Sequence, residues 1–372
     1  MARDGAQTAI EADPLRTAFK HSLALWAVVA PAWVLTVSAL GHKFALDFHH
    51  AFLPAAHAVW HGATPYSHIG SRALAEGSAF IYPPLSAYLL VPFTVLPPLV
   101  AELLATALVA LAVPATLYVL GVRDWRCHAM AFLWWPVIIG IQTANLTLPM
   151  LLGVALAWRY RDRLWVVVAT ALVVALKLFF WPLLVWLVAT RRYRSAVLAA
   201  VGAAVLVVVP WAGIGFAGMR AYPHVLESVS RHEGPRSFSV AALFHTVVPS
   251  WTASSVLETV VGVALLCAVL VLGRRGRDKD AFALALVSIL VLSPLIEMHY
   301  FALLLVVVAL YRRRLELAWL VPLLIWGASA NGPGGSALQL LHVLVVAAAA
   351  VALAMSDWRP RVLARVLQPG TA

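Results

Sequence analysis

Long apolar segments separated by short polar turns repeat along almost the whole chain. The first, from about Leu23 to Leu40, comes close to the roughly 20 apolar residues that a helix needs to cross a membrane. The apolar positions are continuous and do not alternate at every second residue, which excludes a membrane β-barrel. The pattern therefore predicts an all-α protein that crosses a membrane many times.

Composition agrees with this pattern and narrows the class of protein. Of the 372 residues, 63% are hydrophobic and 12% are charged, whereas a soluble domain carries about 25% charged residues. Soluble enzymes, coiled coils, disordered scaffolds and disulfide-stapled secreted domains are therefore excluded. Cys127 and Cys267 lie in or beside apolar segments, so they predict no disulfide framework.

Basic residues mark one side of the membrane. They gather between the apolar segments at positions 3–20, 123–126, 159–163, 191–194, 274–279, 312–314 and 359–365, which together hold 21 of the 27 lysines and arginines. By the positive-inside rule these clusters face the cytoplasm, so we expect a multi-pass plasma-membrane protein with both termini inside. The net charge of +11 belongs to these loops, and we expect no nucleic-acid partner.

Placing every cluster inside requires an out-and-back pair of helices between successive clusters, which gives about twelve spans. Several of these helices would have only about 13–15 residues, below the usual 17–25. The apolar stretch Pro83–Leu96 does not fit as a span, because one more crossing would invert every later loop. We expect it to form a re-entrant or interfacial helix that borders a cavity, and we expect Leu99–Leu120 to be the second span.

These assignments describe one transmembrane domain over residues 1–372. Cytoplasmic tails are predicted at 1–20 and 356–372. A large first extracytoplasmic loop is expected at 41–98 and a second at 213–250, with shorter outer turns at 142–145, Lys177, 293–300 and 331–335.

Polar side chains in the outer loops are the candidates for function, namely Asp47, Tyr66, Tyr82, Gln142, Asn145, Lys177, Glu297 and His299. Ionisable residues at the ends of apolar helices are costly to place there, which favours a functional role. Taken singly, Asp47 also fits a helix N-cap, Lys177 a snorkelling side chain and His299 a structural hydrogen-bonding group. The convergence of several separate turns on one face favours a shared site.

Three histidines of the first loop, His50, His57 and His61, share one helix face near Asp47. Such a set can ligate a metal, but a His-rich helix also suits a polar surface beside lipid. We favour the second interpretation and expect neither a metal nor a cofactor. The sequence contains no nucleotide-binding glycine motif, which argues against ATP-driven transport and cytosolic nucleotide-sugar donors. The segment 220–236 is either an acceptor contact or a solvated loop.

Several of these motifs, in this order, resemble glycosyltransferase family 87. The first loop carries Asp47-Phe48, Ala55-Ala56-His57-Ala58, His61-Gly62-Ala63-Thr64-Pro65-Tyr66 and Tyr82-Pro83-Pro84; later come Gln142-Thr143-Ala144-Asn145, Leu176-Lys177, Leu292-Ser293-Pro294 and His299-Tyr300. The chain departs from the family pattern after Lys177, where the proline is absent, and at Tyr300, where a second histidine is often found. The family contains polyprenol-phosphate-mannose-dependent mannosyltransferases of the GT-C superfamily.

The resemblance implies a GT-C-like fold and a membrane glycosyltransferase of cell-envelope biosynthesis. The donor would be a polyprenyl-phosphate sugar, with mannose favoured, and the acceptor an extracytoplasmic glycolipid or polysaccharide. Asp47 would be the catalytic base, Lys177 and His299 would bind the donor phosphate, and Tyr66, Tyr82, Gln142, Asn145 and Glu297 would line the cavity. A single base without a second nucleophilic carboxylate favours inversion to an α-glycoside.

Two other classes of protein remain. Twelve spans with both ends inside also suit a secondary transporter or a flippase of lipid-linked sugar, although the halves of this chain show no convincing repeat. A non-catalytic assembly subunit of an envelope complex is the third possibility. The three classes differ in whether Asp47 and Lys177 face one shared outer cavity.

Overall fold

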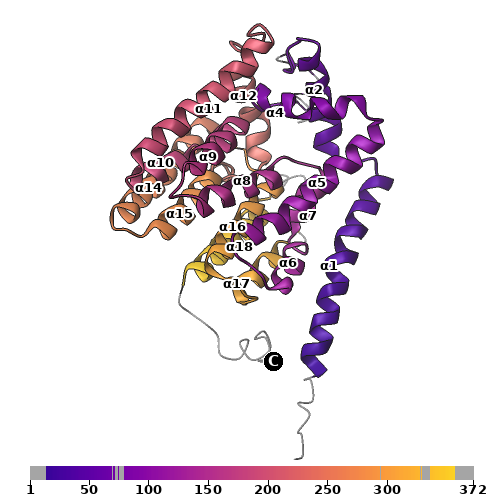
Figure 1. Cartoon of the computed structure of the whole chain (residues 1–372), viewed down its shortest axis with the longest axis vertical. Helices are drawn as coiled ribbons and strands as arrows, with labels where there is room; N and C mark the ends of the chain where they lie inside the picture. Colours follow the sequence, from indigo (N-terminus) through magenta and orange to yellow (C-terminus); the bar gives the residue numbers. More distant parts are fainter. Residues whose placement is uncertain are drawn as a thin grey trace, which may run out of the picture.

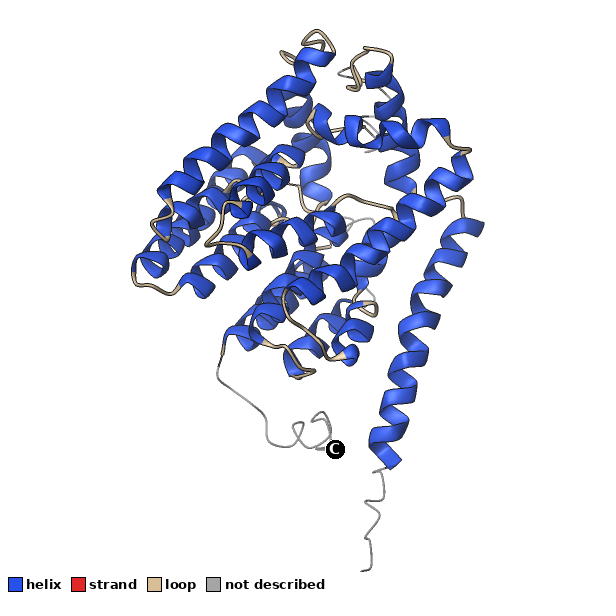
Figure 2. Cartoon of the chain, viewed as in Figure 1, coloured by secondary structure: helices blue, strands red, loops and turns tan. Residues whose placement is uncertain are grey.

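The computed structural model describes residues 14–356 apart from 69, 72–73, 75–78, 294, 327 and 329–335, and this part is helical without strands (Figures 1 and 2). The predicted tails before residue 14 and after 356, and the predicted turn at 331–335, lie outside the described residues. The long helices are α1 (Pro14–Leu40), α5 (Pro98–Val119), α11 (Tyr193–Gly213), α14 (Trp251–Arg274) and α18 (Ala337–Met355).

Shorter helices connect and fill the space between the long ones. On the first loop lie η1 (Phe48–Phe52), α2 (Leu53–Trp60), α4 (Pro84–Leu90) and η2 (Val91–Val95). The middle of the chain forms α6 (Trp125–Ala131), α7 (Trp135–Gln142), α8 (Thr147–Arg159), α9 (Trp165–Leu176), η3 (Leu178–Phe180), α10 (Pro182–Ala189), α12 (Tyr222–Glu233), η4 (Gly234–Arg236) and α13 (Val240–His245). The last part forms α15 (Asp278–Val291), η5 (Met298–Leu303), α16 (Leu304–Tyr311), α17 (Leu317–Leu320) and η6 (Val321–Ile325).

Fewer helices in the described part of the chain are long enough to span a membrane than the twelve spans that the sequence predicts. Within the described residues, five helices are long and apolar enough to cross a membrane, and a sixth span results if α7 and α8, bent by 119°, are counted together. The expected out-and-back helices are present, but α9 has 12 residues, a length of about 18 Å against a hydrocarbon core of about 30 Å. The expectation of about twelve crossings is therefore not supported. An apolar segment predicts a buried or lipid-facing helix, but it does not specify whether that helix is long enough to cross the membrane.

The segment between the first loop and α5 agrees with the sequence prediction. Residues Pro84–Val95 form a short apolar helical stretch that ends before α5 begins at Pro98. Pro83 and Pro97 precede the two helices as N-caps in an extended conformation, which separates them from the preceding chain. The stretch is too short to cross a membrane by itself, and α5 matches the predicted second span.

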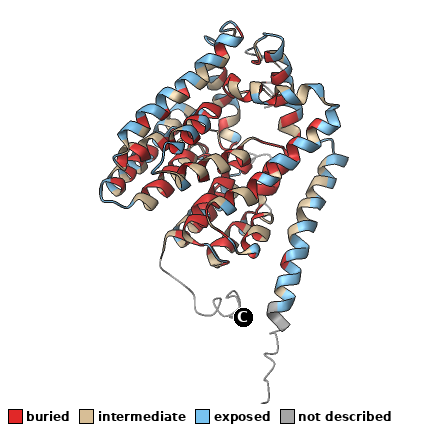
Figure 3. Ribbon diagram, viewed as in Figure 1, coloured by how far each residue is buried: buried red, intermediate tan, exposed pale blue. Residues whose placement is uncertain are grey.

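The core of the bundle surrounds α16, whose residues from Leu304 to Leu310 are all buried (Figure 3). A helix that is apolar on every side must be covered on every side. Here α15 and α18 pack against α16, together with parts of α5 and α8. Because η5 leads directly into α16, the polar residues at the start of η5 are held by the most buried element of the fold.

Helix α1 lies beside this bundle, and most of its surface is exposed (Figures 1 and 3). It contacts only α6 and α7 extensively. Exposed apolar side chains such as Leu25, Val28 and Trp33 fit a helix that faces lipid. The segment that follows α1 turns back onto the bundle and delivers Asp47.

The orientation predicted from the basic clusters is open to a direct test. Val247, which follows α13, and Arg275, which follows α14, are both exposed and lie at opposite ends of α14. In a Cys267→Ala background, Val247→Cys should react with an impermeant thiol reagent on intact cells and Arg275→Cys should react only after permeabilisation. Labelling of Arg275→Cys alone in intact cells would reverse the orientation.

Candidate functional site

Two segments about a hundred residues apart are joined by backbone hydrogen bonds. The amide of Ala45 donates to the carbonyl of Gln142 at 2.8 Å, and the amide of Asp47 donates to the carbonyl of Thr143 at 3.2 Å. The Gln142 side-chain amide donates to the Lys43 carbonyl. Ala45 and Ala144 have positive φ angles of 50° and 51°, a conformation that L residues adopt only when the surroundings impose it. These contacts fix Asp47 against the turn between α7 and α8.

Asp47 uses its carboxylate within the site and not as a helix cap. No hydrogen bond joins its side chain to the start of η1, and Asn145 Nδ2 donates to Asp47 Oδ2 at 2.5 Å. Asn145 is itself held, because its Oδ1 accepts from the amide of Thr147 at 2.9 Å and from Thr147 Oγ1 at 2.8 Å. Burial raises the pKa of the Asp47 carboxyl, despite the opposing effects of Asn145 and Lys177. A raised pKa suits a carboxylate that accepts a proton near neutral pH.

Lys177 extends the same network on the other side of Thr147. It terminates α9 in an extended conformation, and only 5% of the residue is exposed. Its Nζ donates to Thr147 Oγ1 at 3.4 Å and lies 3.5 Å from the ring centre of Tyr300 and 4.9 Å from that of Tyr82. The side chain therefore points into the protein, so the snorkelling interpretation does not hold.

Glu297 and His299 reach the site from the start of η5. His299 is 1% exposed, and its Nδ1 lies 3.4 Å from Glu297 Oε2. Although 47% of the Glu297 side chain is accessible, that carboxylate lines a cavity shared with Asp47. Burial and the charge of Asp47 raise the pKa of Glu297 to about 7.

One group of metal-ligand atoms forms here. One ligand atom each of Asp47, Glu297 and His299 lies within 4.8 Å of the others, which suits a divalent cation. Among the described residues, His50, His57 and His61 form no such group. Those histidines therefore do not make the cluster that their spacing allows, because their helix exposes them separately.

Two adjacent cavities are lined by residues of this network. The larger, of about 750 Å³, is lined by Asp47, Gln142, Glu297, His299 and Arg236 among others. The smaller, of about 210 Å³, is lined by Tyr82, Pro83, Lys177, Phe179 and Tyr300 among others. Ile81, Val229 and Leu295 line both. Asp47 lines only the larger cavity and Lys177 only the smaller one, so the two residues face neighbouring cavities and not the single shared cavity that the sequence analysis considered.

The two remaining predicted residues, Tyr66 and Gln142, pack against or bond to the segments that carry the site. Tyr66 is 7% exposed, donates to the carbonyl of Tyr82 at 2.8 Å and stacks on Trp211 with ring centres 5.1 Å apart. It lines neither of the two cavities. Gln142 lines the larger cavity, but its amide is engaged by the first loop.

Two residues of the site, Thr147 and Tyr300, were not predicted as site residues from the sequence. Thr147 connects Asn145 to Lys177 by hydrogen bonds. Because asparagine side chains often bond to residues two positions further along, the spacing of Asn145 and Thr147 is a sequence signal that could have indicated this contact. Tyr300 lies under the Lys177 ammonium. Arg236 belongs to the segment 220–236, whose role the sequence left open, and it lines the larger cavity from η4.

A family model described as glycosyltransferase family 87 matches residues 80–296. No curated protein and no solved structure matches the chain. The matched segment contains Tyr82, Asn145 and Lys177, whereas Asp47 lies before it and Glu297 and His299 lie after it. The fold therefore adds to the matched segment the two acidic residues and the histidine that complete the site.

Proposed function

This chain belongs to glycosyltransferase family 87, and from that premise we propose that it moves a sugar, most simply mannose, from a polyprenyl-phosphate donor to an extracytoplasmic glycolipid or glycan. The observation that carries this proposal is the bridge from Asp47 through Asn145 and Thr147 to Lys177. It links a carboxylate that lines the larger cavity to an amine that lines the neighbouring smaller one. A glycosyl transfer needs both, one at the attacking hydroxyl and one at the leaving phosphate.

Each group has one part in the reaction. The acceptor oxygen bonds to the anomeric carbon while the bond from that carbon to the phosphate oxygen breaks on the opposite face. The proton of the acceptor hydroxyl passes to the Asp47 carboxylate, and the electron pair of the broken bond stays on the phosphate beside Lys177. Asn145 orients Asp47 by its hydrogen bond. One displacement inverts the configuration, so a β-linked donor gives an α-glycoside.

The two cavities differ in their lining, and each lining suits one of the two substrates. The aromatic cavity with Lys177 suits the sugar phosphate of the donor, because rings bind the apolar faces of a sugar and the ammonium meets the anion. The larger cavity with Asp47 and Arg236 suits a polar acceptor. We place the active site on the extracytoplasmic side, opposite the basic clusters.

The proposal is tested with membranes that contain the protein and radiolabelled polyprenyl phosphomannose. Label should appear in a glycolipid or glycan product, and an α-mannosidase should release it. Passage of the intact donor across the bilayer without a glycoside product would support the transporter or flippase alternative. A product formed equally well by membranes without the protein would contradict the proposal.

Metal removal is expected to leave transfer mostly intact. Burial lowers the pKa of the Lys177 amine, while the nearby carboxylates of Glu297 and Asp47 favour its charged form. The donor phosphate adds a further negative charge that favours the ammonium, so the departing phosphate does not need a metal cation. The measurement is the initial rate with and without EDTA. Loss of activity with EDTA and its return with manganese or zinc would assign the Asp47, Glu297 and His299 atoms to a metal.

The affinity for the donor is expected to depend on pH through Glu297. Below its pKa of about 7 the carboxyl is protonated and neutral, whereas above that pH it adds a negative charge near the donor phosphate. The donor KM should therefore rise as the pH passes 7 and should stay flat in Glu297→Gln. An equal rise in both proteins would place the titration elsewhere.

A further inference from the structure

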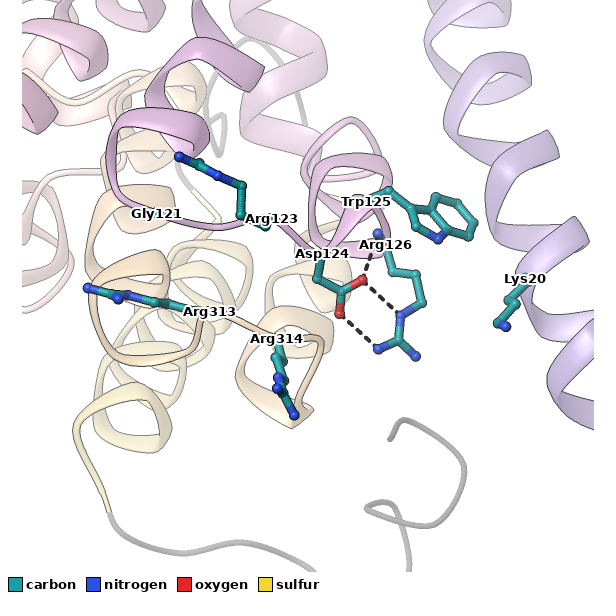
Figure 4. A pocket seen from close by; sticks show the side chains of 8 residues that line it. All are labelled: Lys20, Gly121, Arg123, Asp124, Trp125, Arg126, Arg313 and Arg314. Atoms are coloured by element: carbon teal, nitrogen blue, oxygen red, sulfur yellow. Dashed lines mark hydrogen bonds and ion pairs between the residues drawn. The ribbon is translucent and has the colours of Figure 1, made fainter. Parts of the chain in front are cut away.

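A further cavity, with a strongly basic lining, lies at the other end of α1. It has a volume of about 430 Å³ and is lined by Lys20, Gly121, Arg123, Asp124, Trp125, Arg126, Arg313 and Arg314 (Figure 4). Lys20 and the end of α1 at Leu40 are 20 residues apart, which is about 30 Å along a helix. The cavity is therefore separate from the Asp47 site and takes no part in its chemistry.

Asp124 brings the cations of this cavity together. Its carboxylate accepts from Arg126 Nε at 2.9 Å and Arg126 Nη2 at 2.8 Å, and also from the backbone amide of Leu315 at 3.1 Å. These bonds tie the turn between α5 and α6 to the turn between α16 and α17. Asp124 is the one acidic residue among those that line the cavity, and its carboxylate already accepts these hydrogen bonds. The bond to Leu315 holds the neighbouring Arg313 and Arg314 close to Asp124.

The cations that remain are not neutralised by the described part of the chain. Arg313 lies against Gly121, with its guanidinium carbon 3.6 Å from the point where a side chain at Gly121 would begin. Arg313, Arg314 and Lys20 are exposed, and no ion pair joins them to any described residue. Figure 4 shows Lys20 on α1 across from the Arg126–Asp124 pair, so the opening is bordered by cations from three elements.

Apolar surface continues directly from the basic opening. Trp125 is 46% exposed at its edge, and a tryptophan in this position is typical of the level of lipid headgroups. Along α1, Leu25, Trp26 and Val28 are exposed just beyond Lys20. A ligand with a phosphate at the cations has a hydrocarbon surface beside it on the loosely packed α1.

We propose that this cavity binds the phosphate headgroup of an anionic phospholipid from the cytoplasmic leaflet, with the acyl chains along α1. The cations complement the phosphate, and the exposed apolar face of α1 complements the chains. The inference rests on the orientation set by the basic clusters and not on the sugar or donor. Lipid bound here ties α1, through Lys20, to the turns of α5–α6 and α16–α17.

Native mass spectrometry of the purified full chain tests this binding. The probes are dioleoylphosphatidylglycerol, dioleoylphosphatidylcholine and inorganic phosphate, each added separately. The wild-type protein should retain phosphatidylglycerol in preference to phosphatidylcholine. The Arg313→Gln/Arg314→Gln protein should bind phosphatidylglycerol at least about tenfold more weakly, since each cation near a membrane surface contributes substantially to anionic-lipid binding.

The matched control is Arg159→Gln/Arg275→Gln, which removes two exposed arginines from other basic clusters. It should bind phosphatidylglycerol like the wild-type protein. Equal weakening in both double variants would overturn the proposal, because general surface charge would then explain the binding. Equal retention of phosphatidylcholine would also overturn it, and saturation by inorganic phosphate alone would assign the cavity to a soluble phosphate. Size-exclusion profiles establish that each variant is folded.

Discussion

Asp47→Asn is expected to leave the protein folded and inserted while turnover falls by about 10² to 10⁴, the usual effect of losing a general base. An asparagine at this position still accepts the hydrogen bond from Asn145 Nδ2, so the contact between the first loop and the α7–α8 turn is kept. It cannot take the proton of the acceptor hydroxyl. The measurement is kcat with saturating donor and acceptor, and donor binding should be preserved.

The matched control for this variant is Glu227→Gln. Glu227 is an acidic residue of α12 that is 55% exposed and pairs with Arg231 on the surface, and a pair of that kind contributes little to stability. Its variant should transfer sugar at the wild-type rate. If Asp47→Asn kept more than about a tenth of the activity, less than ~1.4 kcal/mol of barrier would depend on the carboxylate. Glu297 would then be the next candidate for the base.

Lys177→Met is expected to lower kcat by about 10² to 10³, the usual effect of removing one group that stabilises a developing anion. Methionine is nearly as long as lysine and remains compatible with the rings of Tyr82 and Tyr300. The loss therefore reports on the ammonium charge more than on packing. Because the charge on phosphate grows as its bond to the sugar breaks, kcat should fall more than donor affinity.

Lys279→Met is the control for Lys177→Met. Lys279 also places its ammonium over a tyrosine ring, 3.9 Å from the centre of Tyr311, but it belongs to α15 at a basic cluster. Its variant loses the same charge and the same kind of ring contact, and it should keep full activity. Equal losses in the two variants would show that the effect comes from packing, and the role of Lys177 in catalysis would be rejected.

The helices and their order were largely predictable from the chain alone. Continuous apolar segments require helices because backbone groups in a membrane need internal partners. The stretch Pro83–Leu96 was predicted as a short separate helix and α5 as a full span, in agreement with Pro84–Val95 and Pro98–Val119. The turns at 142–145 and at Lys177 were also predicted, since polar residues interrupt the apolar segments there.

The number of spans was not predictable in the same way. Hydropathy reports that α9, α10 and α16 are apolar, but not whether lipid or neighbouring helices cover them. In the structure α16 is covered on all sides, and an internal helix of this kind has no need to match the thickness of a membrane. The positions of the basic residues predict on which side of the membrane each turn lies. They do not predict how far each helix extends into the membrane.

The site itself was determined only in part by the sequence. The residue types and their places at outer turns predicted Asp47, Lys177, Glu297 and His299 as site residues, and the order of the motifs indicated the family. Only the tertiary structure decided that Asp47 bonds Asn145 across 98 residues and does not cap a helix. The physical reason is that long-range backbone hydrogen bonds hold the two distant turns together, and this contact imposes the positive φ angles at Ala45 and Ala144. Such long-range pairing depends on packing of the whole bundle, which leaves no periodic signal in the sequence.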